Sequence, residues 1–332
     1  MKKILICVSA LLALAGCTSA PVALPPVNDP VTLRVNLFRG SSNIPIYMAL
    51  ETGAFARRNI QVALEFTPNS NAQREGLAAG RFDIAQAAVD NAVAMIEVAK
   101  ADAVIVAGGD GGMNELMVRP EIRSIADLKG RAYAVDAPNT AYALVGRKIL
   151  KNADLVDGRD YQLALLGGAE GRTKALDTPA AAATLLNPPW TFIARERGAH
   201  SLGTTAQLFG PYQAQGLFVM RPWAAANGAA LERFLTAFIE GCRAAQDPRK
   251  KELTLQVLAR ELKLDRRTAE LTYQQLSSAG GLAKDCALDM QGFRNVLALR
   301  AEIEGQWGGQ APAPGRFLDL GFYERALRHA AN

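Results

Sequence analysis

The chain has 332 residues, of which 49% are hydrophobic and 21% are charged, so it is an ordinary globular sequence long enough for two domains. Its 37 Lys and Arg residues exceed its 32 Asp and Glu residues only slightly, and it contains no basic block or aromatic ladder. This balance argues against nucleic acid as a partner.

The first residues have the pattern of a targeting signal. Lys2 and Lys3 precede an apolar stretch over residues 4–14 that is too short for a stable membrane-spanning helix. The tetrapeptide Leu-Ala-Gly-Cys that ends at Cys17 matches the bacterial lipoprotein box. We therefore expect residues 1–17 to be a lipoprotein signal peptide, with acylated Cys17 anchoring an exported body on the periplasmic face or the cell surface. A plain secretory signal followed by a chance cysteine is the alternative.

A proline-rich segment over residues 18–30 follows the signal and is expected to act as a semi-rigid linker. Beyond it only two cysteines remain, Cys242 and Cys286. An exported compartment permits a disulfide between them, whereas the position of Cys242 on an apolar helix stripe favours a buried free thiol. The sequence leaves both possibilities open.

The first half of the body alternates predicted strands and helices. Strands are expected over 32–38, 60–66, 82–89, 103–107 and 114–118, and helices over 46–52, from Ser70 to near Gly80, and after residue 90. A capping box at Ser70–Gln73 starts the second helix, and Asp90 or Asn91 is expected to cap the third. This half predicts one α/β lobe.

A second α/β unit is expected to follow. It comprises a short capped helix over 124–130, strands over 132–135, 161–166 and 180–186, and helices over 141–151, near 172–176 and over 191–197. A strand over 217–220 returns to lobe one. The remainder is expected to be helical, with an amphipathic stripe over 231–242 and weaker helices over 253–262 and 269–276. We expect these helices to pack on lobe one, covered by residues 316–319.

Polar side chains recur where predicted strands end, which is the edge at which open α/β sheets bind ligands. In the first half they are Arg39, Asn43, Ser70, Asn71, Asp90, Asn91 and Asp110, and in the second half Asp136, Asn139, Thr140, Glu170, Asn187, Pro188 and Trp190. Any single Ser, Asn or Asp among them could merely cap a helix. Their collection at one edge of both halves favours ligand binding.

The chemistry of these candidates points in two directions. The carboxylates would make an acidic cleft suited to a cationic or N–H-rich ligand, whereas Arg39 suits a carboxylate or sulfonate. Arg39 could also be a solvated loop residue. Trp190 could stack on a ligand or pack against the neighbouring prolines.

Catalytic signatures are weak. The two histidines, His200 and His329, lie far apart in sequence and outside any metal-ligand pattern. The glycine-rich run over 108–112 matches neither a P-loop nor a dinucleotide fingerprint, and no G-x-S-x-G elbow occurs. We therefore expect no catalytic residues, no metal and no cofactor.

At this point the arrangement resembles a known family. The lipobox, the loop after the first strand, Gly80–Ala85, the Ser-Ile-Ala-Asp-Leu-Lys-Gly segment at 124–130 and Leu-Asn-Pro-Pro at 186–189 resemble the solute-binding lipoproteins and periplasmic proteins of ABC importers. The nearest branch is the nitrate/sulfonate/taurine (SsuA-like) and thiamine-pyrimidine-precursor (NMT1/THI5-like) group. The similarity covers nearly all of residues 31–300.

The resemblance implies a two-lobed type 2 periplasmic-binding-protein fold, a Venus flytrap of two open α/β sheets. Lobe one would comprise residues 31–119 and 219–332 and lobe two residues 120–218, with hinge crossings near Arg119–Pro120 and Phe218–Met220. The resemblance places ligand contacts at Asp90, Asn91, Asn139, Thr140 and Pro188. It implies a small organic solute, a membrane permease as partner, and a monomer.

Two alternative functions remain open from the sequence. One is an enzyme on the same scaffold, such as the related branch that makes the thiamine pyrimidine, although the cysteine-rich segment and histidine of that branch have no counterpart here. The other is a sensor module that binds a solute and signals to a membrane partner.

Overall fold

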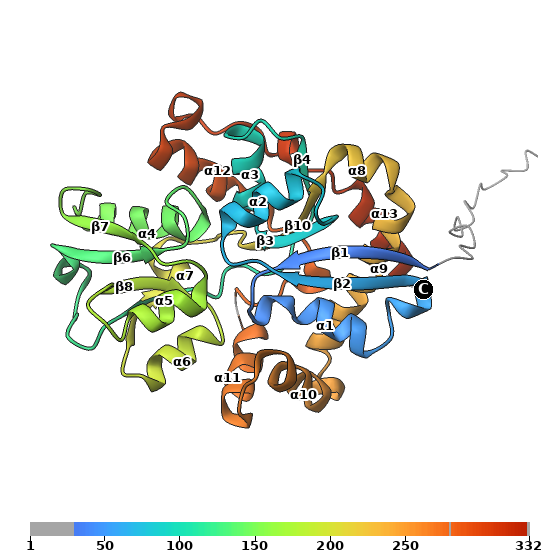
Figure 1. The fold of residues 1–332 in the computed structure, drawn as a ribbon, viewed down its shortest axis with the longest axis horizontal. Helices are drawn as coiled ribbons and strands as arrows, with labels where there is room; N and C mark the ends of the chain where they lie inside the picture. Colours follow the sequence, from blue (N-terminus) through green and yellow to red (C-terminus); the bar gives the residue numbers. More distant parts are fainter. Residues whose placement is uncertain (1–29, 279, 331–332) are drawn as a thin grey trace, which may run out of the picture.

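The computed structural model describes residues 30–278 and 280–330, which form two five-stranded sheets side by side (Figure 1). We call the halves built on them lobe one and lobe two. The strands of lobe one, in spatial order, are β2 (Ile60–Phe66), β1 (Val31–Leu37), β3 (Ile84–Ala88), β10 (Gln215–Met220) and β4 (Ala103–Ala107). Those of lobe two are β7 (Tyr161–Leu165), β6 (Arg131–Val135), β8 (Ala183–Leu186), β5 (Glu115–Val118) and β9 (His200–Thr204).

The two sheets share one topology. In each sheet the fourth strand, β10 or β5, comes from outside the parallel run and pairs antiparallel with both of its neighbours. The remaining ladders, β1 with β2 and β3, and β6 with β7 and β8, are parallel. The predicted two-sheet α/β architecture is therefore confirmed, and the carboxyl ends of the parallel strands set the place of a ligand.

The chain crosses between the lobes earlier than the sequence predicted, at both points. Because β5 belongs to the second sheet, the first crossing is residues 108–114, not Arg119–Pro120. Because β10 belongs to the first sheet from Gln215 on, the second crossing precedes it, at residues 209–214. The crossings are joined where the Ala214 amide donates to the Asp110 carbonyl oxygen at 3.2 Å.

Helices cover both sheets. Around lobe one they are α1 (Ile44–Glu51), α2 (Ser70–Ala78), α3 (Asp90–Glu97), α8 (Arg221–Ala226), α9 (Gly228–Gln246), α10 (Lys251–Leu262), α11 (Arg266–Leu276) and α13 (Gly321–Ala330). Those of lobe two are α4 (Ala141–Asn152), α5 (Ala169–Ala175), α6 (Trp190–Glu196) and α7 (Thr205–Leu208), and α12 (Met290–Glu304) lies between the lobes (Figure 1).

The sheet of lobe one separates two hydrophobic cores. Alternate side chains of a strand point to opposite faces, so Ile84 packs in one core with α1 and α9, whereas Ala85 packs in the other with α3. The predicted stripe of α9 is confirmed, because its apolar side chains from Leu231 to Cys242 are fully buried against the sheet and α1.

Some elements differ from the sequence predictions. The strand β9 and the helices α7 and α8 were not predicted, and β3 is shorter than the predicted range 82–89. Helix α3 is capped by neither Asp90 nor Asn91, since Val89 already has helical dihedral angles and occupies the N-cap position. Helix α2 is capped by the side chain of Asn69, not by Ser70.

The domain bounds implied by the resemblance place all of residues 219–332 in lobe one, but α12 contacts lobe two as well. Its Glu302 carboxylate pairs with Lys148 and Lys151 of α4 at 2.7 and 2.9 Å, and Glu304 pairs with Arg147. Its apolar face, which includes Phe293, joins the core that runs from α3 to α4. Helix α12 therefore bridges the two lobes, as Figure 1 also shows. This long-range pairing has no local sequence signature.

The predictions for the signal peptide, Cys17 and residues 18–29 of the linker concern a segment outside the described residues. Within the part of the chain that the structure describes, no helix has the length and apolarity needed to cross a bilayer. Both Cys242 and Cys286 are buried free thiols.

Candidate functional site

A cavity of about 610 Å³ lies between the lobes at the carboxyl ends of the strands. Its volume falls in the range of small-molecule sites. Nine of the candidate residues line it: Arg39, Asn43, Ser70 and Asn91 from lobe one, and Asp136, Thr140, Glu170, Asn187 and Trp190 from lobe two. The clustering expected from sequence is thus present in space for these residues.

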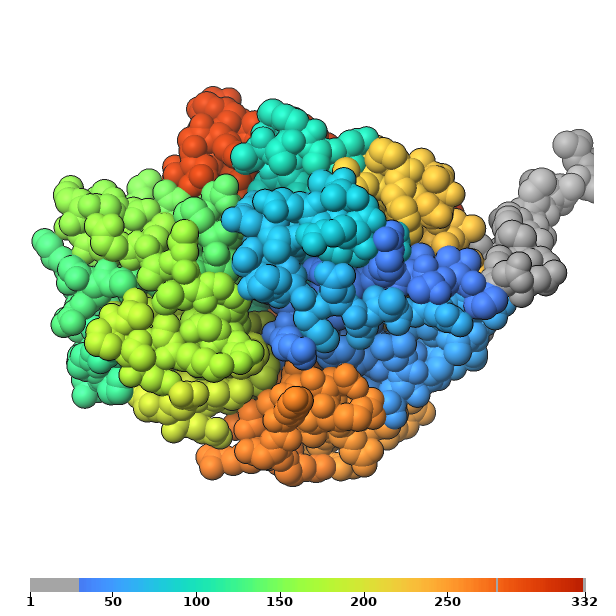
Figure 2. Space-filling model, viewed as in Figure 1, coloured from blue at the N-terminus to red at the C-terminus, as the bar shows by residue number. Residues whose placement is uncertain are grey.

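Hydrogen bonds join the two lobes at residues that line or adjoin this cavity. The Ser41 hydroxyl donates to the Pro188 carbonyl oxygen at 2.8 Å, and the Trp190 indole N–H donates to the Arg39 carbonyl oxygen at 3.1 Å. The Gly168 amide donates to the Pro68 carbonyl oxygen at 3.1 Å. In Figure 2 the green and yellow-green atoms of lobe two abut the blue atoms of lobe one. The structure therefore shows the two lobes in a closed arrangement.

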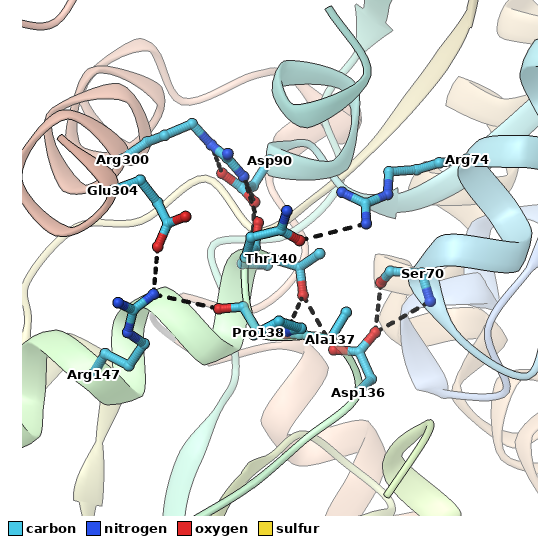
Figure 3. A network of polar contacts seen from close by, with 12 residues as sticks. Ser70, Arg74, Asp90, Asp136, Ala137, Pro138, Thr140, Arg147, Arg300 and Glu304 are labelled. Atoms are coloured by element: carbon cyan, nitrogen blue, oxygen red, sulfur yellow. Dashed lines mark hydrogen bonds and ion pairs between the residues drawn. The ribbon is translucent and has the colours of Figure 1, made fainter. Parts of the chain in front are cut away.

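Asp136 links the lobes at the edge of the cavity. One carboxylate oxygen accepts hydrogen bonds from the Ser70 amide at 3.2 Å and from the Ser70 hydroxyl at 2.5 Å, and the other accepts from the Thr140 hydroxyl at 3.2 Å. Because Asn69 caps helix α2, the Ser70 hydroxyl is left to make this contact between lobes (Figure 3). The carboxylate of Asp136 is thus already satisfied by protein donors.

Asp90 lies in a buried ion pair rather than on the cavity wall. Arg300 of α12 donates to its two carboxylate oxygens from Nε at 2.9 Å and Nη2 at 2.7 Å, and both side chains are at most 1% exposed. The Ala141 amide at the start of α4 donates to the same carboxylate at 2.7 Å, and Arg300 Nη2 donates to the Asn139 carbonyl oxygen at 2.8 Å. Figure 3 shows Asp90 at the junction of α3, α4 and α12.

The other candidates lie near the cavity without lining it. Asn71 and Asn139 both accept from the Arg74 guanidinium, which spans the lobes, and Pro188 contributes its carbonyl oxygen to the closing seam. Asp110 lies in the first crossing, where its carboxylate accepts from the Gly112 amide at 3.0 Å. These residues are placed to support closure or the crossing.

Comparison with known proteins identifies the relatives of this chain. The model of the NMT1-like family matches residues 28–259, which is more than half of the chain. The chain belongs to the NMT1-like family. No curated protein sequence is similar enough to this NMT1-like chain to match it.

Solved structures similar to this NMT1-like protein include three binding proteins. The nitrate-binding protein NrtA of Synechocystis PCC 6803 has a TM-score of 0.75 and 14% identity, over 90% of this chain and 89% of that one. The alkanesulfonate-binding protein SsuA of Xanthomonas axonopodis pv. citri, bound to MOPS, has a TM-score of 0.69 and 18% identity, over 89% and 99%. A zinc-bound ligand-binding component of an ABC-type import system from Staphylococcus aureus has a TM-score of 0.74 and 12% identity, over 89% and 98%.

These likenesses confirm the predicted type 2 periplasmic-binding-protein fold of the NMT1-like chain. One named neighbour carries zinc, but the described residues of this chain contain no group of three His, Cys, Asp or Glu side chains that could hold a metal ion.

The charged side chains of the cavity differ in how they are compensated. The Lys174 ammonium pairs with Glu170 at 2.8 Å at the exposed rim, and the Arg39 guanidinium lies 4.0 Å from the centre of the Phe66 ring. Arg172, by contrast, is only 5% exposed and donates to two uncharged oxygens, Thr184 Oγ1 at 2.9 Å and the Leu185 carbonyl oxygen at 2.6 Å. The cavity therefore holds one buried cation without an anionic partner among the described residues.

Sequence reasoning missed several lining residues. They are Phe38, Phe66, Tyr142, Arg172 and Gln215, among others. Arg172 lies in α5, directly after the glycine-rich segment at residues 167–171 that follows β7, and that segment was the available signal. Gln215 reaches the cavity as the first residue of β10, and its amide donates to the Tyr142 hydroxyl at 2.9 Å. The aromatic residues Phe38, Phe66 and Tyr142 lie at the ends of strands or helices. The sequence there does not indicate whether an aromatic side chain points into the cavity or away from it.

The buried carboxyl of Asp110, in the first crossing between the lobes, makes the stability of the protein depend on pH. Burial raises the pKa of its carboxyl to about 6, against the opposing effects of the Ser42 hydroxyl and the Gly112 amide. The folded protein therefore holds this proton more tightly than the unfolded chain. As pH rises from about 4 to about 6, ionisation of Asp110 lowers the free energy of unfolding.

We expect Asp110→Asn, which removes that charge and keeps the acceptor for Gly112, to stabilise the protein by up to about 3 kcal/mol above pH 6. The gain should shrink as pH falls to about 4, because Asp110 is then protonated in the folded protein and is losing its charge in the unfolded chain as well. Urea unfolding of both proteins between pH 4 and pH 8 measures this difference. A gain that is constant across this range would contradict the assignment.

Proposed function

We propose that this NMT1-like protein is the extracytoplasmic, lipid-anchored solute-binding component of an ABC importer. It binds a small organic solute, namely a sulfonate, a carboxylate or a pyrimidine-like compound, between its two lobes. The observation that carries the proposal is the cavity of about 610 Å³ between two sheets, closed by hydrogen bonds from one lobe to the other. The likeness of its fold to nitrate-, alkanesulfonate- and import-system ligand-binding proteins supports it.

Closure supplies the mechanism. A solute that contacts both lobes binds more tightly to the closed state than to the open state, so it shifts the population towards closure. Trp190 and Ser70 illustrate this coupling, since each lines the cavity and also bonds to the opposite lobe. A membrane permease then distinguishes the closed, loaded form from the open form by the relative position of the lobes.

The anchor and the partners complete the proposal. Acylation of Cys17 and the linker over residues 18–30 would hold the body near the permease while leaving it free to reorient. The protein would act as a monomer, without a cofactor or a nucleic-acid partner.

The proposal is tested by native mass spectrometry of residues 18–332 as purified, followed by small-angle scattering before and after removal of the solute. We expect a retained small organic molecule that is recovered chemically unchanged, and a larger radius of gyration once it is removed. A chemically converted molecule would support the enzyme alternative. A protein that retains no solute and keeps the same radius of gyration would contradict solute-driven closure.

A further inference from the structure

We propose that the solute is an organic anion with a flat apolar body, and that Arg172 holds its anionic group inside the closed cavity. The inference rests on the proposed function and names the class of solute for that site. It starts from the one buried cation among the described residues that line the cavity, Arg172 in the middle of the short helix α5.

The contacts of Arg172 leave its charge uncompensated. Its Nη1 atom donates to Thr184 Oγ1 and to the Leu185 carbonyl oxygen, both neutral, and its Nε atom has no hydrogen-bond partner in the described part of the chain. A buried charge is costly unless it is paired and hydrogen-bonded. Because those two bonds fix the guanidinium in place, an anion entering the cavity meets an oriented donor and removes this cost.

Carboxylates of the protein do not fill that role. Asp136 is saturated by Ser70 and Thr140, and Glu170 pairs with Lys174 at the rim. Neither forms an ion pair with Arg172 in the described residues. The charged side chains that line the cavity are three cations and two anions, namely Arg39, Arg172 and Lys174 against Asp136 and Glu170, so the lining carries an excess of one positive charge. A cationic solute would be repelled from the interior, which decides between the two ligand chemistries left open by the sequence.

The rest of the wall selects the body of the solute. Aromatic and apolar side chains from both lobes surround the space, namely Phe38, Phe66, Tyr142, Leu166 and Trp190. Aromatic walls favour flat rings by stacking and edge-to-face contact. The amide of Asn91, whose Oδ1 atom is buried without a hydrogen-bond partner among the described residues, adds one acceptor for an N–H or O–H group of that body. A bare inorganic anion would leave these surfaces unused.

The test compares matched probes by calorimetry on the folded, solute-free protein. Benzoate and benzenesulfonate carry a ring and an anionic group, benzamide carries the ring alone, and methanesulfonate carries the anionic group with a single carbon. We expect at least one ring anion to bind, with benzamide and methanesulfonate each at least about 10-fold weaker. We expect Arg172→Gln to weaken the ring anion about 100-fold and Arg172→Lys to retain part of the affinity, because lysine keeps the charge without the planar fork.

Lys174→Gln is the matched control, because it removes a cation of the same α5 helix that is already paired at the rim, and we expect it to change affinity less than about 3-fold. Circular dichroism checks that each variant is folded. Benzamide binding as tightly as the anions, or an Arg172→Gln variant with unchanged anion affinity, would overturn the proposal, and so would a wild-type protein that binds neither ring anion. A neutral solute retained in native mass spectrometry would overturn it while leaving the solute-binding function intact.

Discussion

Replacing Asp90 by alanine is expected to lower the free energy of unfolding by about 3–5 kcal/mol, because it leaves the Arg300 guanidinium buried without its counter-charge. Both partners are essentially inaccessible to water, and Asp90 accepts three hydrogen bonds, two from Arg300 and one from the Ala141 amide. The same change removes a link between lobe one, α4 and α12. Urea unfolding of the single variant at neutral pH measures the loss.

A double-mutant cycle separates the pair from its surroundings. Arg300→Leu should cost a similar amount, and the double variant should cost clearly less than the two single changes together, since no charge is then left buried. Glu252→Ala is the matched control, because Arg266 holds Glu252 by an equally bidentate pair at 2.7 and 2.8 Å on the exposed surface. We expect a loss of at most about 1 kcal/mol there. Equal losses for the buried and exposed pairs would contradict this account.

Substitution of Gly241 by alanine is expected to destabilise the protein by about 3 kcal/mol or more, through overpacking between α9 and α1. A Cβ atom at this position would lie 2.8 Å from Ala49 Cβ and 2.9 Å from the Ala49 nitrogen, and closer still to the Pro45 carbonyl oxygen. These are mostly backbone atoms of a neighbouring helix, so the two helices must move apart to accommodate one methyl group.

Gly315→Ala provides the control for this substitution. A Cβ atom there meets no atom within 4 Å, and residue 315 is exposed on the surface. We expect a change within about 0.5 kcal/mol for this variant. Thermal and urea unfolding of both proteins give the comparison, and a Gly241→Ala variant as stable as the wild type would show that the helices are not in close contact.

Much of the fold could be predicted because its signals are local. The alternation in β2 and the continuous apolar run in β4 mark these strands at the residues observed, Ile60–Phe66 and Ala103–Ala107. The stripe of α9 has the spacing of one helix face. The strand β9, with the sequence His-Ser-Leu-Gly-Thr, carries neither alternation nor an apolar run, because it lies at the sheet edge with every residue half-buried.

The sequence predicted where the candidate site lies, at the carboxyl ends of the strands, but not what each of its side chains binds. Ser70 and Thr140 were identified as cap-type residues at strand ends, and they do line the cavity, but their hydroxyl groups bond to Asp136 rather than to helix ends. Asp90 was expected to contact ligand, whereas the structure places it in an ion pair with a residue 210 positions later in the chain. Local sequence carries no information on such a partner.

Two α/β halves with polar strand ends could be predicted from local patterns alone, because hydrophobic periodicity and turn chemistry act over a few residues. Three features became known only from the folded chain: which segments cross between the lobes, that α12 contacts both of them, and that Arg172 is a buried cation lining the cavity. Each of these depends on contacts between residues far apart in sequence. Whether a charge is compensated depends on what surrounds it in space, so the chemistry of the cavity could be read only after the chain was folded.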